Sequence, residues 1–236
     1  MNQEEIWAEY IKDLTVEDVV DNYNNPAIFQ KELKDLIEQY SKLYKNTIEV
    51  GCETGVTSLL MDDSFSKTFL DLNPLAIDLV QGAANKLGKS GTFIVADMFD
   101  MPFDDKSFDV VFNAGVIEHF TKSERIDALS EYARILKDEG VIFIGFPNHY
   151  SVPYRLAYVL RNLFKKWPYP EEYKIYDMKE EIAKSNMVLE NRVVLSKKSV
   201  FNWLSFAKPL EKLFILLDKV FNFEGYLVVL IVRKGG

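Results

Sequence analysis

The sequence predicts an α/β fold in which a doubly wound, mostly parallel β-sheet is covered by helices on both faces. Three observations predict it. From Thr47 onward, short apolar runs of strand length alternate with segments that have a helical period. A turn with two glycines follows the first of these runs, and a last apolar run after the final helical segment is expected to close the same sheet. Such alternation is typical of parallel strands joined by helices.

The composition favours one compact unit and argues against several classes of protein. The chain has 236 residues, 48% of them hydrophobic, which is enough for a full core. Its formal net charge of −8 argues against a protein that coats nucleic acid, so no nucleic-acid partner is expected. Cys52 is the single cysteine, and two histidines with scattered carboxylates show no ligand spacing, so neither disulfides nor a metal site is predicted. The acidic N-terminus does not resemble a secretory signal, and the expected location is cytoplasmic.

Residues 1–45 are predicted to form an N-terminal helical cap. Two apolar helical periods occur there, and Asn25 followed by Pro26 supplies an N-cap and a first-turn proline for the second. The first period comprises Trp7, Tyr10, Ile11 and Leu14, and the second comprises Phe29, Leu33, Leu36, Ile37, Tyr40 and Tyr44.

Residues 46–148 are predicted to form the core of the fold. Strands are expected at 48–50, 68–70, 92–95, 110–112 and 141–146. Two of the helices between these strands have recognisable end signals. The first begins with an N-cap and a first-turn proline, the second begins with a capping box, and each ends at a glycine. The residues concerned are Asn73, Pro74 and Gly88 for the first helix, and Thr121, Glu124 and Gly140 for the second.

Residues 149–236 are predicted to form a lid or substrate segment, followed by strands that complete the sheet. The expected order is a basic helical segment, a short helix capped by Asp177 with Glu180, a strand near 188–195, a long apolar helix and a last strand at 226–232. Pro209 is expected to kink the long helix, because a proline inside a helix removes a backbone hydrogen bond. The sheet would then have seven strands.

The turn IEVGCETGV, residues 48–56, discriminates between two kinds of nucleotide ligand. A glycine turn lets the backbone approach a nucleotide, and an acid about 20 positions later can hold ribose hydroxyls; Asp71 lies 20 residues after Gly51. The dinucleotide motif would need glycines at 53 and 56, where the chain has Glu53 and Val56. Because Glu53 would repel a pyrophosphate at the helix N-terminus, the turn favours a cationic nucleoside without phosphate.

In these residues the chain resembles the class I S-adenosylmethionine-dependent methyltransferases, especially the type 11 methyltransferase domain. The family's first motif, E/D-x-G-x-G-x-G, is matched by Glu49-Val-Gly51-Cys-Glu53-Thr-Gly55, with glutamate replacing the middle glycine. Further matches follow in order over roughly residues 46–148. They are Phe69-Leu-Asp71-Leu-Asn-Pro, Ala96-Asp97-Met98, Met101-Pro-Phe103, Ser107-Phe-Asp109-Val-Val-Phe-Asn113-Ala-Gly115, Glu118-His119-Phe120 and Arg134-Ile-Leu-Lys-Asp-Glu-Gly140.

The resemblance implies a Rossmann-like sheet with an antiparallel last strand and S-adenosylmethionine as cofactor. It also implies that Glu49 meets the ammonium end of the ligand and that Asp71 accepts both ribose hydroxyls. Leu72 would lie along the adenine, and Asp97 would face its amino group. The expected cofactor-binding residues are Glu49, Gly51, Cys52, Glu53, Gly55, Asp71, Leu72, Asp97, Met98, Asn113 and Gly115.

The implied reaction is in-line methyl transfer to an oxygen, nitrogen or carbon of a small-molecule or lipid-like acceptor, helped mainly by alignment and exclusion of water. His119 is the candidate general base, since histidine titrates near neutrality; the alternative is a residue that packs beside the cofactor. The candidate substrate-binding residues are Tyr10, Tyr23, His149, Tyr150 and Tyr154. Two other functions stay open: a protein that binds S-adenosylmethionine without turnover, and a NAD(P)-dependent oxidoreductase, which Glu53 and Val56 disfavour.

Residues 154–167 have two interpretations. They carry Arg155, Arg161, Lys165 and Lys166 and no acid, with apolar residues on one helical face. Such a helix is either a lid whose lysines are solvated or a peripheral contact with an anionic membrane surface. The later helix, with Trp203, Ala207, Leu210, Phe214, Leu217 and Phe221, is interpreted as core or dimer contact rather than a membrane anchor. The oligomeric state is left open.

Overall fold

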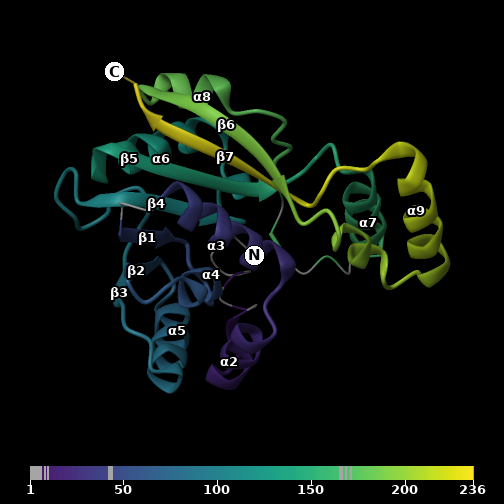
Figure 1. Cartoon of the computed structure of the whole chain (residues 1–236), viewed down its shortest axis with the longest axis horizontal. Coiled ribbons are helices and arrows are strands. Elements are labelled where there is room, and N and C mark those ends of the chain that lie inside the picture. The colour runs from purple at the N-terminus through teal and green to yellow at the C-terminus, as the bar shows by residue number, and fades with distance from the viewer. Residues whose placement is uncertain are drawn as a thin grey trace.

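A seven-stranded sheet with the order β3-β2-β1-β4-β5-β7-β6 forms the centre of the computed structural model (Figure 1). The structure describes residues 7, 9, 11–41, 45–164, 167, 169–170 and 172–235. Strand β7 is antiparallel to β5 and β6, and the other paired strands are parallel. This confirms the predicted fold class. The strands are β1 Asn46–Val50, β2 Ser66–Asp71, β3 Thr92–Val95, β4 Phe108–Ala114, β5 Leu136–Pro147, β6 Met187–Leu195 and β7 Leu227–Lys234.

Helices cover both faces of the sheet. The alternation of side chains along β4 shows this: Val111 packs on the α6 side, whereas Val110 and Phe112 pack against α3. Helices α6 and α8 cover one face, and α2 to α5 cover the other. Their bounds are α2 Val16–Asn24, α3 Ile28–Tyr40, α4 Val56–Leu60, α5 Pro74–Leu87, η1 Ile117–His119, α6 Lys122–Ile135, α7 Val152–Leu163, α8 Lys179–Lys184, η2 Val200–Leu204 and α9 Lys208–Phe221.

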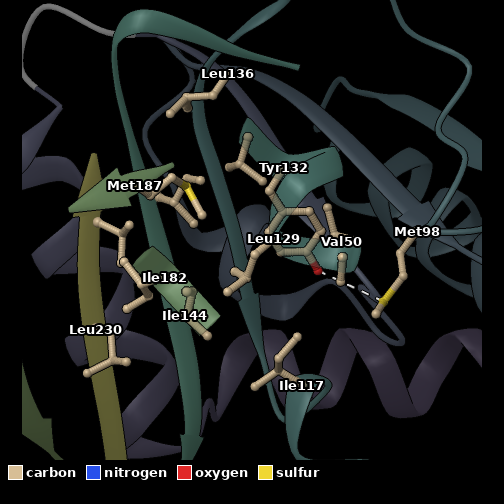
Figure 2. Packing of buried hydrophobic residues seen from close by; sticks show 14 of the residues in the cluster. Val50, Met98, Ile117, Leu129, Tyr132, Leu136, Ile144, Ile182, Met187 and Leu230 are labelled. Carbon is tan, nitrogen blue, oxygen red and sulfur yellow. Dashed lines mark hydrogen bonds between the residues drawn. The ribbon is translucent and has the colours of Figure 1, made fainter. Parts of the chain in front are cut away.

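The largest apolar cluster fixes α6 against the sheet. Leu129 and Tyr132 of α6 and Ile182 of α8 lie among strand residues such as Val50 and Ile144 (Figure 2). All five side chains are almost completely buried. Since burying a large apolar side chain contributes roughly 1.5–3 kcal/mol, this packing holds α6 rigidly behind the strand ends.

Helix α2 is an additional helix that the sequence analysis did not separate. Thr15 and Asp18 form a capping box at its N-terminus, and Asn25 is its C-cap. The prediction that Asn25 caps the next helix is therefore wrong. Helix α3 has Ala27 as N-cap, and the Gln30 side chain accepts the Ala27 N–H at 2.9 Å.

Two further helix boundaries differ from their predictions. The capping box of Thr121 and Glu124 is confirmed, but α6 ends at Ile135, and Gly140 lies inside β5. A Cβ on Gly140 would lie 2.6 Å from Leu136 Cδ1, which explains the glycine as a close approach within the strand. Helix α8 has Met178 as its N-cap, although Asp177 accepts the Lys179 N–H at 3.2 Å.

Helices α7, η2 and α9 form a lobe that extends to one side of the sheet (Figure 1). Its own apolar cluster includes Tyr154, Phe201 and Phe214. Pro209 lies in the first turn of α9, where a proline costs no backbone bond, so the predicted kink is absent. Among the described residues, no helix has the length and hydrophobicity to span a bilayer.

Candidate active site

A cavity of about 700 Å³ opens where the chain leaves β1, β2, β3 and β4. The strand order reverses between β1 and β4, and this position is where open α/β sheets bind ligands. The cavity wall combines apolar, aromatic and acidic side chains. They are Trp7, Ile11, Gly51, Glu53, Leu70, Asp71, Leu72, Asn73, Pro74, Ala96, Asp97, Met98, Phe99, Ala114, Gly115, Val116, His119 and Phe120.

The turn after β1 brings the backbone to the cavity. The N–H groups of Gly51 and Cys52 donate to the Leu70 carbonyl at 2.8 and 3.0 Å, which ties the turn to β2. Gly51 has φ +67°, and a Cβ there would lie 2.7 Å from Cγ2 of Val116. Glu53 also has a left-handed backbone, with φ +49°. The glutamate therefore takes a conformation that glycine would adopt without strain.

Asp71 connects the turn to the start of α5. Its Oδ2 accepts the Glu53 N–H and its Oδ1 accepts the Asn73 N–H, both at 2.9 Å. Burial raises the pKa of Asp71 above its ordinary value. The neighbouring Leu72 is 51% exposed, although it lines the cavity. A carboxylate that accepts hydrogen bonds and an exposed apolar side chain thus lie side by side.

Two further carboxyl groups surround the same turn. Glu49 is buried behind it and accepts the Ser58 N–H at 3.3 Å. Burial raises the pKa of Glu49 to about 7; burial, followed by the charge of Asp71, raises that of Glu53 to about 7. Within the part of the chain that the structure describes, none of these three carboxyl groups forms an ion pair with a basic side chain. The turn is therefore an acidic environment that no basic side chain of the described residues neutralises.

The base of the cavity is set by a short hydrogen-bonded series. Asn113 Nδ2 donates to the Tyr132 hydroxyl at 2.9 Å. That hydroxyl donates to Met98 Sδ at 3.9 Å, as Figure 2 shows. Met98 lines the cavity, whereas Asn113 and Tyr132 are buried beneath it. The rigid α6 thereby fixes a side chain of the loop that follows β3.

Aromatic residues form another part of the wall. The rings of Trp7 and His119 meet edge to face at 5.3 Å, and those of Phe99 and Phe120 do the same at 5.3 Å. His119 is buried, and its Nε2 lies 4.0 Å from Glu118 Oε1. Trp7, Phe99 and Phe120 were not predicted to line the site. A signal was available for two of them, since Phe99 directly follows the Ala96-Asp97-Met98 motif and Phe120 is the last residue of the Glu118-His119-Phe120 motif.

The structure brings most of the expected cofactor residues together. Those that line the cavity are Gly51, Glu53, Asp71, Leu72, Asp97, Met98 and Gly115, together with the candidate base His119. The remaining four support it from behind. Cys52 is buried, Gly55 turns the chain into α4 with φ +60°, and Glu49 and Asn113 are buried as described above.

The candidate substrate residues are dispersed. Tyr10 lies outside the described residues, and none of the other four lines the cavity. Tyr23 packs beside α5, Tyr150 is exposed, and the buried Tyr154 donates its hydroxyl to Glu172 at 2.9 Å. Burial lowers the pKa of His149 to about 4, so its ring is neutral at pH 7. The substrate roles of these residues stay predictions.

Comparison with known proteins gives one family match. Residues 48–144 match the family model described as a methyltransferase domain. Over these residues the chain is similar to the S-adenosylmethionine-dependent methyltransferases. Members of this family use S-adenosylmethionine as the methyl donor. The matched residues begin in β1 and end in β5, and so contain all four loops that line the cavity.

The relatives differ in how much of their own length the chain covers. It is 28% identical to an uncharacterized protein of Methanocaldococcus jannaschii over 58% of the chain and 59% of that protein, less than two thirds of its length. It is 27% identical to malonyl-[acyl-carrier protein] O-methyltransferase 1 of Ilyobacter polytropus over 80% of the chain and 71% of that enzyme. The fold is similar to that of geranyl diphosphate C-methyltransferase from Streptomyces coelicolor, with a TM-score of 0.64 at 15% identity over 86% and 79% of the two chains.

The cavity fits S-adenosylmethionine, the methyl donor of the matched family. S-adenosylmethionine combines an adenosine with a sulfonium and an ammonium group. The carboxyl groups of Glu49 and Glu53, which have no basic partner among the described residues, suit those cationic groups. The close approach at Gly51 suits a nucleoside, and the exposed Leu72 offers a surface for a flat base.

Proposed function

We propose that the chain transfers the methyl group of S-adenosylmethionine in line to an apolar small-molecule or lipid-like acceptor. One observation carries the proposal: a single cavity combines acidic groups, which have no counter-charge among the described residues, with a wall of partly buried aromatic rings. The acidic groups suit a cationic donor, and the rings suit an apolar acceptor.

In this proposal each donor group meets a residue of matching chemistry. Asp71 accepts the ribose hydroxyls, Leu72 lies along the adenine, and Asp97 faces its amino group. Glu49 and Glu53 attract the cationic end. When bound, S-adenosylmethionine supplies an activated methyl group. The position of the Asp71 carboxylate, fixed by two backbone N–H groups at 2.9 Å, supports its role as an organised acceptor.

The residues around the acceptor have two tasks in this proposal. Trp7 and Phe120 exclude water and leave the nucleophile less solvated, and the rigid wall keeps it aligned with the methyl carbon. His119 is placed to take a proton from an acceptor hydroxyl or amine at its ring nitrogen. Its burial in the cavity wall supports this role.

Residues 154–167 are proposed to close the acceptor side. Ring contacts lead from this segment to the cavity: Trp167 lies 5.6 Å from Tyr169, Tyr169 lies 6.1 Å from Trp7, and Trp7 touches His119. The outward side chains Val159, Leu163 and Phe164 are exposed, which supports a peripheral membrane contact by the same segment.

Two comparisons support a small-molecule or lipid-like acceptor. One relative is named for an acyl-carrier substrate, and a protein of similar fold is named for geranyl diphosphate. A cytoplasmic location is part of the proposal and agrees with the single, unpaired Cys52.

The test is transfer of a labelled methyl group from S-adenosylmethionine to a fractionated cell extract. The native protein is expected to label an apolar fraction. Asp71→Ala is expected to lose donor binding and labelling, while Asp78→Ala, at an exposed aspartate of α5, keeps both. Donor binding without any labelled product would instead assign the protein to the non-catalytic binders, and unchanged affinity in Asp71→Ala would contradict the ribose assignment.

A further inference from the structure

Helix α9 carries an apolar stripe that faces solvent. Leu213, Leu216 and Val220 recur at helical spacing and are 47%, 59% and 77% exposed. The opposite side of the helix packs on the lobe through Phe214, which is buried. An isolated exposed apolar side chain is ordinary, but three apolar side chains in one stripe indicate an interaction surface.

Basic residues flank this stripe. Lys212 and Lys219 are exposed and adjoin Leu216 at spacings of four and three residues. The two acids of α9 are engaged elsewhere: Glu211 pairs with Lys208 at 2.9 Å, and Asp218 accepts the Phe223 N–H at 2.7 Å. We define the α9 face as Lys212, Leu213, Leu216, Lys219 and Val220.

The charge of the lobe is opposite to that of the whole chain. Residues 152–164 and 197–221 contain seven Lys and Arg against two Asp and Glu, a net charge of +5 in a chain of −8. The basic groups concentrate around exposed apolar side chains, which include Leu163 and Phe164 at the end of α7. Arg161 lies over the Phe206 ring at 4.9 Å, so basic and apolar groups are also in direct contact here.

We propose that the α9 face docks on the surface of a bilayer that contains anionic lipids. Such a surface offers acyl chains to the apolar stripe and negative headgroups to the lysines, whose long stems can extend outward from buried apolar neighbours. A second copy of the chain would bring an equally basic surface against this one, and like charges repel. An acidic soluble partner would match the charges but does not account for the three exposed apolar side chains between them.

The docking proposal does not depend on the proposed acceptor. It concerns a surface on the lobe, whereas the donor cavity lies at the strand ends. Variants of the α9 face are therefore expected to keep their affinity for S-adenosylmethionine, which also verifies their folding.

The test is co-sedimentation of the full chain with phosphatidylcholine vesicles, with and without phosphatidylglycerol, at low and high salt. The native chain is expected to bind the phosphatidylglycerol vesicles and to be released by salt. Leu216→Glu with Val220→Glu is expected to weaken binding more than about tenfold. Each of Lys212→Gln and Lys219→Gln is expected to weaken it about fivefold. Val188→Glu, at a 55% exposed valine of β6, is the matched control and is expected to bind like the native chain.

Three outcomes would overturn the proposal. The first is failure of the native chain to bind phosphatidylglycerol vesicles at low salt, and the second is equal binding by the double glutamate variant. The third is a dimer in light scattering that the double variant converts to monomer, which would assign the α9 face to a second copy. Unaltered vesicle binding by both lysine variants would contradict the proposed attraction between these lysines and the anionic headgroups.

Discussion

Glu53 combines a left-handed backbone with a carboxyl group whose pKa is raised to about 7. A non-glycine residue in this conformation costs roughly 1–2 kcal/mol. Retaining a glutamate there, beside Asp71, adds electrostatic repulsion to that strain. A bound cation would compensate the charge of the carboxylate, so both costs can be explained by a contribution of Glu53 to binding of a cationic ligand.

Donor affinity is expected to rise with pH through about 7. Only the ionised Glu49 and Glu53 attract the sulfonium and ammonium groups, and their pKa values of about 7 mean that both are largely protonated under acidic conditions. Titration calorimetry between about pH 6 and pH 8 should show roughly a tenfold gain in affinity. Without donor, the stability of the fold changes with pH in the opposite direction. A carboxyl pKa that is raised in the folded state stabilises the fold at low pH, and that contribution is lost as pH rises from about 4.5 to 7.

Two controls identify the charge responsible. Glu53→Gln should reduce the pH dependence of donor affinity and leave the part that Glu49 contributes. S-adenosylhomocysteine, which lacks the sulfonium charge, should show a smaller gain than S-adenosylmethionine. Equal pH profiles for the two ligands in the native chain would exclude a role of Glu53 toward the sulfonium.

The acidic part of the site could be predicted from the sequence, and the aromatic part could not. Glu53, Asp71 and Asp97 follow strand ends at recognisable spacing, so their meeting at one sheet edge follows from the order of elements. Trp7 reaches the cavity from the N-terminal region through tertiary packing alone. Tyr23 was assigned to the substrate pocket from its expected place in the N-terminal cap, but it packs beside α5. The sequence of a helix does not tell which neighbour its face meets.

At the scale of elements, the turn between β1 and α4 is expected to tolerate a glycine-to-alanine substitution less well than the turn after α5, where Gly88 has the same left-handed backbone. Gly51→Ala and Gly88→Ala both introduce a Cβ at a left-handed position, with φ +67° and +66°. The strain should cost each variant about 1–2 kcal/mol in urea unfolding. At Gly88 nothing lies within 4 Å of the new Cβ, whereas at Gly51 it meets Val116 at 2.7 Å. Gly51→Ala should therefore also lose donor affinity; equal behaviour of the two variants would contradict this account.

Strands and helices with a single clear sequence signal were predicted well. Helix α2, next to which two capping signals compete, was missed. The cores of all seven strands were predicted, because short apolar runs have few alternative structures in an α/β pattern. The ends of α5 at Asn73 and Gly88 were also predicted. Helix α2 was missed although Thr15 and Asp18 form a capping box, because Asn25 and Pro26 offered a competing start.

At the scale of the whole molecule, donor binding is expected to stabilise the entire fold, since the cavity joins loops from four strands. A ligand at about 100 times its dissociation constant contributes about 2.7 kcal/mol. For a chain of this size that corresponds to a rise in Tm of roughly 5–10 °C. Thermal unfolding with S-adenosylmethionine should show this rise, and the same concentration of NAD⁺ should not. A larger effect of NAD⁺ would favour the dinucleotide alternative that Glu53 opposes.

Strand β7 lies between β5 and β6, although it is the last of the three in the chain. A ribosome therefore makes β6 before β7, its partner strand in the described sheet, and residues 196–226 must be added between them. At about 5–20 residues per second this takes a few seconds. Until β7 has also emerged and paired, both edges of β6 are bare, and chaperones or β6 strands from neighbouring nascent chains are the competitors that β7 must displace.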